Sequence, residues 1–204
     1  MTKIKICGLK RLEDINYVNE LLPEYIGFVF AKSKRQIDIK SAWNLKNKLS
    51  HIIKPVGVFV NEDKNFIKKL SDEKIIELVQ LHGDEDKDYI ISLKKMIEIP
   101  IIKAIRVRNE QDIISAQKLP CDYLLLDTFV ENEAGGSGRA FNHEIIPPLI
   151  KPFFLAGGLN PQNVNTAIDI ASPYAVDVSS GVEETGVKSM LLIKEFIDNI
   201  REKR

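Results

Sequence analysis

The sequence predicts an α/β protein, a single (β/α)₈ barrel domain of near-minimal size that covers residues 1–204. Two observations predict this fold. Short apolar runs recur eight times at fairly even intervals, and polar segments with helical periodicity follow them. Several runs are almost continuously apolar, as expected for parallel strands buried between a helical layer and a packed barrel interior.

The expected elements alternate along the whole chain. Strands are expected at residues 4–7, 25–30, 55–60, 76–81, 101–106, 123–127, 153–156 and 174–178. Helices are expected at residues 13–22, 39–49, 63–70, 87–97, 111–119, 142–150, 161–170 and 188–200. The helix at 142–150 is the weakest, because it is short and Pro147 and Pro148 should break its final turn. The helix at 161–170 has a clear start, because Asn160 offers a capping side chain and Pro161 suits the first helical position.

Composition and charge limit the classes of partner. The chain is 44% hydrophobic and 28% charged, which is ordinary for a globular protein with a sizeable core. Lysine plus arginine and aspartate plus glutamate both number 29, so the formal net charge is zero. A neutral protein has no overall attraction for nucleic acid or for an anionic membrane, so neither is an expected partner. Any recognition of phosphate must therefore be local.

Two further features concern location and redox state. No run approaches the roughly 20 apolar residues of a membrane span, and the first residues lack a signal peptide's hydrophobic region, which predicts a cytoplasmic protein. Cys7 ends its expected strand whereas Cys121 begins another, so parallel strands would place the two thiols at opposite ends of the sheet. Both are predicted to be free, with a structural role for Cys121.

The residues at the strand ends point to proton-transfer chemistry, because the active site of this fold lies at the carboxyl end of the strands. Cys7 ends the first strand and Asp127 the sixth, so a thiol and a carboxyl are expected to share one pocket. Burial beside residues 124–126 helps the carboxyl to hold its proton, whereas a thiolate needs positive charge or amide donors nearby. Strand alternation places Lys5 on the interior face with Cys7. Lys5 then either helps to hold the thiolate or pairs with an interior acid such as Asp177.

Glycine-rich turns after the last two strands predict a phosphate site. Gly157 and Gly158 precede a helix start, and Ser180 and Gly181 follow the final strand. Glycine lets backbone amides approach a phosphate closely, and the loops after strands seven and eight are the usual phosphate site of this fold. Either pair alone would be explained as a tight turn, but together they favour phosphate binding.

The strand ends and the turns after them contain a series of short tracts. They are KICGL at 5–9, GFVFA at 27–31 followed by Arg35, VGVFVN at 56–61, QLHGDE at 80–85, KAIR at 103–106, LDT at 126–128, GGSG at 135–138, LAGGLNP at 155–161 and DVSSGVE at 177–183. Taken in order, these tracts resemble the phosphoribosylanthranilate isomerase family of tryptophan biosynthesis over nearly the whole chain. Each tract alone is weak evidence, but their order and spacing together are highly specific.

The resemblance implies a TIM barrel that catalyses an Amadori rearrangement. The reaction converts N-(5-phosphoribosyl)anthranilate into 1-(2-carboxyphenylamino)-1-deoxyribulose 5-phosphate, with Asp127 as the general acid and Cys7 as the general base. The resemblance implies no cofactor. No metal is expected either, because three scattered histidines and two distant thiols form no recognisable zinc cluster.

The resemblance also assigns substrate-binding roles. Arg35 would recognise the anthranilate carboxylate, because the forked donors of a guanidinium match a carboxylate. His82 would line the substrate site, and Asp177 would either bond a sugar hydroxyl or position Lys5. The glycine-rich segment Gly135–Gly138 resembles the family's mobile loop over the anthranilate, with a permanently ordered turn as the alternative.

Two other function classes stay open. The first is another phosphosugar barrel enzyme, such as indole-glycerol-phosphate synthase or the histidine-pathway isomerase. A thiol at strand one with an aspartate at strand six fits these enzymes less well. The second is a noncatalytic phosphate-binding barrel, which the presence of both Cys7 and Asp127 disfavours. The expected partner is a small phosphoribosyl substrate, and a monomer is slightly preferred over a homodimer.

Overall fold

Eight parallel strands form a closed barrel in the computed structural model, in the order β1 to β8. The strands are β1 (Lys3–Cys7), β2 (Tyr25–Val29), β3 (Lys54–Phe59), β4 (Leu78–Leu81), β5 (Ile101–Val107), β6 (Tyr123–Thr128), β7 (Phe153–Leu155) and β8 (Ala175–Val178). The structure describes residues 1–128 and 145–202. Each of the eight strands predicted from the sequence is present, so the predicted barrel fold is confirmed.

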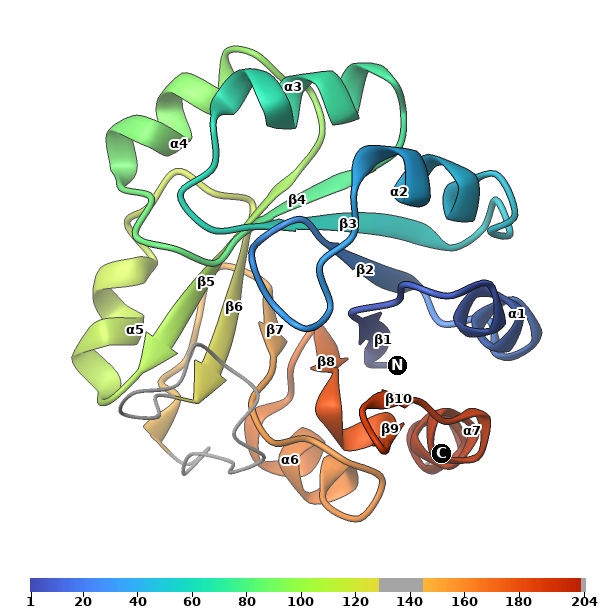
Figure 1. Ribbon diagram of the computed structural model, residues 1–204. Helices are drawn as coiled ribbons and strands as arrows, with labels where there is room; N and C mark the ends of the chain where they lie inside the picture. The colour runs from blue at the N-terminus through green and yellow to red at the C-terminus, as the bar shows by residue number, and fades with distance from the viewer. Residues whose placement is uncertain (129–144, 203–204) are drawn as a thin grey trace.

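Helices surround the barrel on its outer side (Figure 1). They are α1 (Leu12–Leu21), α2 (Ile39–Lys46), α3 (Lys64–Asp72), α4 (Lys87–Lys94), α5 (Glu110–Ala116), α6 (Val164–Ala171) and α7 (Met190–Arg201). Side chains that accept a backbone N–H in the first turn fix several helix starts. They are Asp38 for α2, Asp63 for α3, Asp86 for α4, Asn109 for α5 and Ser189 for α7. No helix within the described residues is long and apolar enough to cross a membrane.

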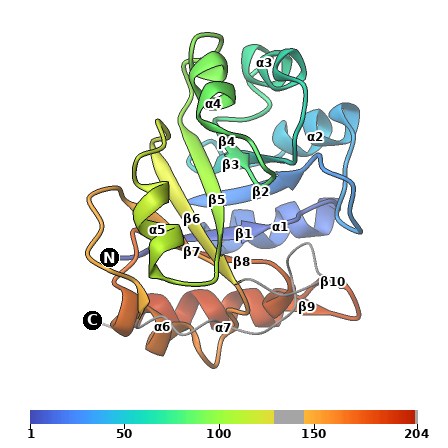
Figure 2. The ribbon, with the colours of Figure 1, turned by 90° about the vertical axis from the view of Figure 1, so that its left-hand side faces the viewer.

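A small hairpin follows β8 and was not predicted. After the 3₁₀ helix η2 (Ser180–Val182), β9 (Glu183–Glu184) pairs antiparallel with β10 (Val187–Lys188). Thr185 and Gly186 form its two-residue turn with φ angles of 50° and 82°, the left-handed region that such hairpins need. Figure 2 shows the hairpin at one end of the barrel, with both chain termini near the opposite end.

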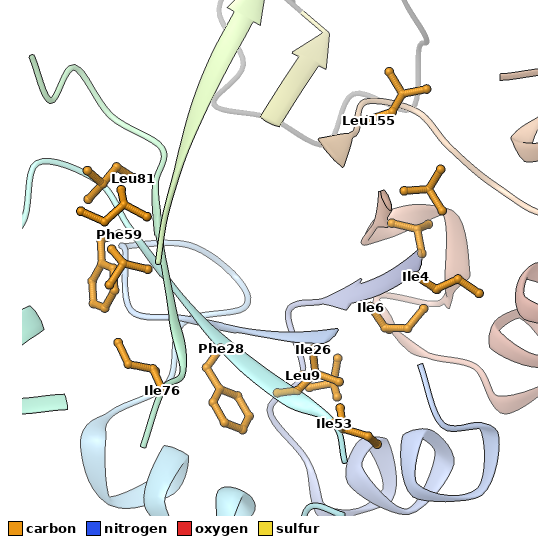
Figure 3. Close-up of a cluster of buried hydrophobic side chains, with 14 of the residues drawn as sticks. Ile4, Ile6, Leu9, Ile26, Phe28, Ile53, Phe59, Ile76, Leu81 and Leu155 are labelled. Carbon is orange, nitrogen blue, oxygen red and sulfur yellow. The ribbon is translucent and has the colours of Figure 1, made fainter. Parts of the chain in front are cut away.

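Side-chain alternation separates two hydrophobic layers. Residues such as Ile4, Ile6, Ile26 and Phe28 point out of the strands and pack under the helices (Figure 3). A second cluster fills the barrel interior, and it includes Tyr25, Val56, Leu78, Ile102, Leu125 and Phe154. The predicted outward direction of Ile4 and Ile6 is thus confirmed, and Lys5 between them points into the barrel.

The observed helices α2, α4 and α5 end three residues earlier than predicted, and three other predicted helices differ more in kind. Within the predicted helix at 142–150, residues 142–144 lie outside the described part, and residues 145–150 form no α-helix, in keeping with Pro147 and Pro148. The helix expected at 161–170 begins at Val164 instead, because Asn160 caps a preceding turn by accepting from the backbone N–H of Gln162. The helix expected at 188–200 begins at Met190, because Lys188 belongs to β10.

A buried ion pair ties the loop that follows β4 to β5. Lys103 Nζ lies 2.9 Å from Glu85 Oε2 and also donates to the carbonyls of Leu81 and Gly83. Glu85 in turn accepts the backbone N–H groups of Asn61 and Gly83. Both charged groups are therefore well bonded, which buried charges require. The pair fixes the loop that follows β4.

Replacing Lys103 by methionine is expected to lower the free energy of unfolding by about 3–5 kcal/mol, because it leaves the Glu85 carboxylate buried without its cation. Lys68→Met is the matched control, since Lys68 forms an exposed ion pair with Asp72 that contributes less than about 1 kcal/mol. Urea denaturation of the three proteins measures both effects. Equal losses in the two variants would show that burial does not set the strength of the Glu85 contact.

Candidate active site

A cavity of about 540 Å³ opens at the carboxyl ends of the strands. Among the residues predicted from the sequence, those that line it are Cys7, Arg35, His82, Asp127, Gly157, Gly158, Asp177 and Ser180. They come from all parts of the chain, so only barrel closure brings them together. Gly135–Gly138, the predicted mobile loop, lies outside the described residues.

Cys7 is the last residue of β1 and faces the cavity. The neighbouring strand must approach it closely, since a Cβ atom at Gly27 would lie 2.5 Å from the Cys7 sulfur. Burial raises the pKa of the Cys7 thiol above its usual value, against the opposing effect of Lys5 and, more weakly, of Lys188. The expected cation is therefore present, but it only partly offsets desolvation. Cys121 is buried just before β6, and both cysteines are free.

Lys5 lies directly behind Cys7 in β1, fully buried, with its Nζ 2.9 Å from Asp177 Oδ1. The two residues are also register partners where β1 meets β8. Burial by itself would lower the pKa of Lys5, but Asp177 and the Cys7 sulfur hold that pKa above its usual value. The two interpretations of Lys5 are thus not exclusive, because it pairs with Asp177 and interacts with the thiol.

Asp127 and His82 meet across the cavity. His82 follows β4 and places its Nε2 3.3 Å from Asp127 Oδ2, while its Nδ1 lies 2.9 Å from the side-chain Nε2 of Gln80. When the Gln80 amide donates to Nδ1, the neutral ring carries its proton on Nε2 and donates to Asp127. His82 therefore contacts the predicted acid directly, in addition to lining the substrate cavity.

The turns after β7 and β8 form the other side of the cavity. Gly157 and Gly158 have φ angles of 88° and 65°, a conformation that residues with a side chain rarely adopt. A Cβ atom at Gly181 would lie 1.9 Å from the Leu159 carbonyl oxygen, so this glycine allows the two turns to pack together. Gly181 follows Ser180, which lines the cavity.

Arg35 reaches the cavity from the loop after β2, but its guanidinium is already paired. Its Nε and Nη2 donate to the two carboxylate oxygens of Glu183 in β9, at 2.7 and 2.8 Å. Lys188 in β10 donates to the same carboxylate at 2.6 Å. Burial would raise the pKa of Glu183, but the hydrogen bonds from Arg35 and Lys188 outweigh it and lower the pKa to about 2.

Several residues of this site were not predicted from the sequence. Arg106 and Gln80 line the cavity from β5 and β4, and Ser179 lines it just after β8. Arg106 lies near the carboxyl end of β5. The rule that active-site residues lie at the carboxyl ends of the strands, which located Cys7 and Asp127, would also have found it. Glu183 belongs to the matching tract at 177–183 but was given no role there. Lys188 had no such signal, because its position depends on the short hairpin. No group of three or more His, Cys, Asp or Glu side chains within residues 1–128 and 145–202 could hold a metal ion.

Comparison with known proteins identifies the family. A family model described as N-(5'phosphoribosyl)anthranilate (PRA) isomerase matches residues 4–199. The N-(5'-phosphoribosyl)anthranilate isomerase of Lachnoclostridium phytofermentans is 48% identical over 96% of this chain and 95% of its own. That of Clostridium acetobutylicum is 44% identical over 98% of both chains. The chain belongs to this family.

Solved structures of phosphoribosylanthranilate isomerases have the same fold. The enzyme from Thermotoga maritima superimposes with a TM-score of 0.90 at 38% identity, over 99% of this chain and 100% of its own. A family structure in complex with reduced 1-(o-carboxyphenylamino)-1-deoxyribulose 5-phosphate gives 0.83 at 37% identity, with the same coverage. The family predicted from the sequence is therefore confirmed.

Replacing Lys5 by methionine is expected to raise the pKa of the Cys7 thiol further, because the positive charge of Lys5 lowers that pKa. Asp177→Asn is expected to lower it, because the negative charge of Asp177 raises it. The pH dependence of Cys7 alkylation, measured in a Cys121→Ala background, reports the thiol pKa.

Lys194→Met serves as the control for these two variants, because Lys194 is an exposed helical residue paired with Asp198. It should leave the pKa of Cys7 unchanged. An unchanged pKa in Lys5→Met as well would contradict the electrostatic role of Lys5.

Proposed function

We propose that this protein converts N-(5'-phosphoribosyl)anthranilate into 1-(2-carboxyphenylamino)-1-deoxyribulose 5-phosphate, with Cys7 as general base and Asp127 as general acid. The activity is an aldose–ketose isomerisation in tryptophan biosynthesis, and it follows from membership of the family. The observation that supports the two catalytic roles is that a thiol from β1 and a carboxyl from β6 line one cavity.

The reaction needs one proton donor and one proton acceptor. Asp127 gives a proton to the furanose ring oxygen, so that the ring opens to a Schiff base. Cys7, as the thiolate, then removes the proton from the neighbouring sugar carbon, and the resulting enolamine tautomerises to the ketone. The oxidation state of the whole molecule does not change, so the proposal involves no redox cofactor.

The neighbours of Asp127 and Cys7 suit these roles. Once Asp127 has given up its proton, the His82 Nε2 at 3.3 Å stabilises the carboxylate that remains. Lys5 and Lys188 supply positive charge that favours the Cys7 thiolate. Because burial still raises the pKa of the thiol, the thiolate fraction and with it kcat/KM should increase as the pH rises towards that pKa.

Different groups of residues would bind the two ends of the substrate. Backbone amides at Gly157, Gly158, Ser180 and Gly181 would hold the phosphate, which the left-handed conformation of the first two glycines supports. Arg35, which also lines the cavity, would bind the anthranilate carboxylate. Asp177 lines the cavity while paired with Lys5 and would contact a sugar hydroxyl from there.

No observation favours another phosphosugar enzyme or a noncatalytic barrel. The 3-hexulose-6-phosphate synthase of Salmonella typhimurium superimposes with a TM-score of 0.75, but its 14% identity reflects the shared fold alone. The presence of Cys7 and Asp127 in one cavity favours an enzyme over a binding module.

The same proposal covers the organisation of the protein. The whole chain, residues 1–204, would act as a single catalytic barrel, because the pairing of β1 with β8 joins two distant segments in one sheet. It would act in the cytoplasm. Its partner is the phosphoribosyl substrate, without nucleic acid or membrane. A related Thermotoga maritima enzyme is described as dimeric, while a monomer remains the slight preference for this chain.

Cys7→Ala and Asp127→Ala are each expected to lower kcat by about 10²–10⁴-fold, because each removes one proton-transfer group. Turnover is followed by the consumption of phosphoribosylanthranilate without added metal. Binding of the reduced product analogue should remain measurable in both variants.

Cys121→Ala is the matched control for the thiol, because Cys121 is buried outside the cavity, and it should keep full turnover. Full turnover in Cys7→Ala or in Asp127→Ala would remove the corresponding residue from the mechanism.

A further inference from the structure

The pairing of Arg35 with Glu183 uses only one edge of the guanidinium. A guanidinium carries five N–H donors in a fixed planar fork. The Glu183 carboxylate takes the side edge, with Nε donating at 2.7 Å and Nη2 at 2.8 Å. The end-on edge, formed by Nη1 and the second N–H of Nη2, lies outside this pair and has the geometry to bind a second carboxylate with two hydrogen bonds.

Glu183 is itself held in place by buried contacts. Lys188 Nζ donates to Glu183 Oε1 at 2.6 Å and to the Ser179 carbonyl at 2.8 Å. The Ser179 hydroxyl donates to the Cys7 carbonyl at 3.1 Å. Lys188 is only 4% exposed, so moving Glu183 away would leave a buried ammonium without its carboxylate. The contacts thus favour a Glu183 that stays in place when substrate binds.

The aliphatic part of Arg35 is fixed from the other side. Gly8 has a φ of 84°, and a Cβ atom there would lie 2.4 Å from Arg35 Cδ. The arginine stem therefore lies against the backbone of Gly8, immediately after Cys7. With its stem on Gly8 and its side edge on Glu183, the guanidinium has little freedom to rotate.

The charges of the network leave one positive charge for a ligand. Arg35 and Lys188 are cations and Glu183 is one anion, so the three together carry a net charge of +1. Both cations act on the Glu183 carboxylate, and Lys188 additionally lowers the pKa of Cys7. A carboxylate on the aromatic end of the substrate would neutralise the remaining charge.

We propose that Glu183, supported by Lys188, is a positioning residue that presets the end-on edge of Arg35 and so determines specificity for a substrate carrying an aromatic carboxylate. This inference rests on the proposed function. The opposite arrangement, in which Glu183 occupies the site until the substrate carboxylate displaces it, uses the same contacts but predicts the opposite effect of removing its charge.

The test compares two ligands in wild type and in Glu183→Gln. The first ligand is reduced 1-(o-carboxyphenylamino)-1-deoxyribulose 5-phosphate, and the second is the same compound without the carboxyl group. Calorimetry should show that Glu183→Gln weakens binding of the first ligand by on the order of tenfold or more, with little effect on the second. In kinetics, KM for phosphoribosylanthranilate should rise far more than kcat falls.

Two further variants keep the test valid. Glu184→Gln is the matched control, because Glu184 is an exposed neighbour in the same strand, and it should bind both ligands like wild type. Glu183→Gln leaves Lys188 buried without its anion, so the double variant with Lys188→Met tests the same proposal without that unpaired charge. It should show the same selective loss for the carboxylated ligand.

The outcomes separate the proposal from its alternatives. If Glu183→Gln weakens binding of both ligands equally, Glu183 has a merely structural role, and if binding is unchanged, it has no role. If the carboxylated ligand binds more tightly to Glu183→Gln, the substrate displaces Glu183. Each of these results overturns the inference. Wild-type protein that binds neither ligand and lacks turnover would overturn the proposed function, and the inference with it. If the wild type binds and turns over normally and Glu183→Gln binds both ligands like the wild type, only the inference is overturned.

Discussion

The pairing of β1 with β8 is the constraint on which the site depends. These strands lie near opposite ends of the chain, and their register places Lys5 opposite Asp177, the same two residues that form a buried ion pair at 2.9 Å. Closing the barrel therefore brings two opposite charges together inside the protein, where each compensates the desolvation of the other. It also brings Cys7 beside the turn that follows β8. Without this closure, the thiol and the proposed phosphate site would not share a cavity.

Charged side chains line and surround the cavity, and their arrangement decides what each can do. Lys5 and Lys188 both act to lower the pKa of the Cys7 thiol, yet burial still raises it above its usual value. A thiol with a raised pKa is less often a thiolate, and the protonated form reacts less readily with electrophiles. Arg35 does not act on the site alone, because Glu183 fixes one edge of its guanidinium. The site is thus preorganised by ion pairs rather than by single side chains.

The fold was largely predictable because its signals are local and repeated. Eight apolar strands and most of the helices follow from periodicity and capping, which act over a few residues. Each exception has its own physical reason. The β9–β10 hairpin has only two residues in each strand, too few to show alternation, so Lys188 was assigned to a helix instead. Asn160 does cap a turn as its sequence indicates, but the α-helix starts only after that turn, at Val164.

By itself, the sequence determined the barrel, the order of its strands, the family and the residues at the strand ends, including Cys7, Asp127 and the glycines after β7 and β8. These features depend on local pattern and on the rule that parallel strands end on one face of the barrel. Only the tertiary structure decided which charges meet: Lys5 with Asp177, His82 with Asp127, and Arg35 with Glu183 and Lys188. The partners of a buried charge depend on contacts between segments far apart in the chain, and no local pattern encodes them.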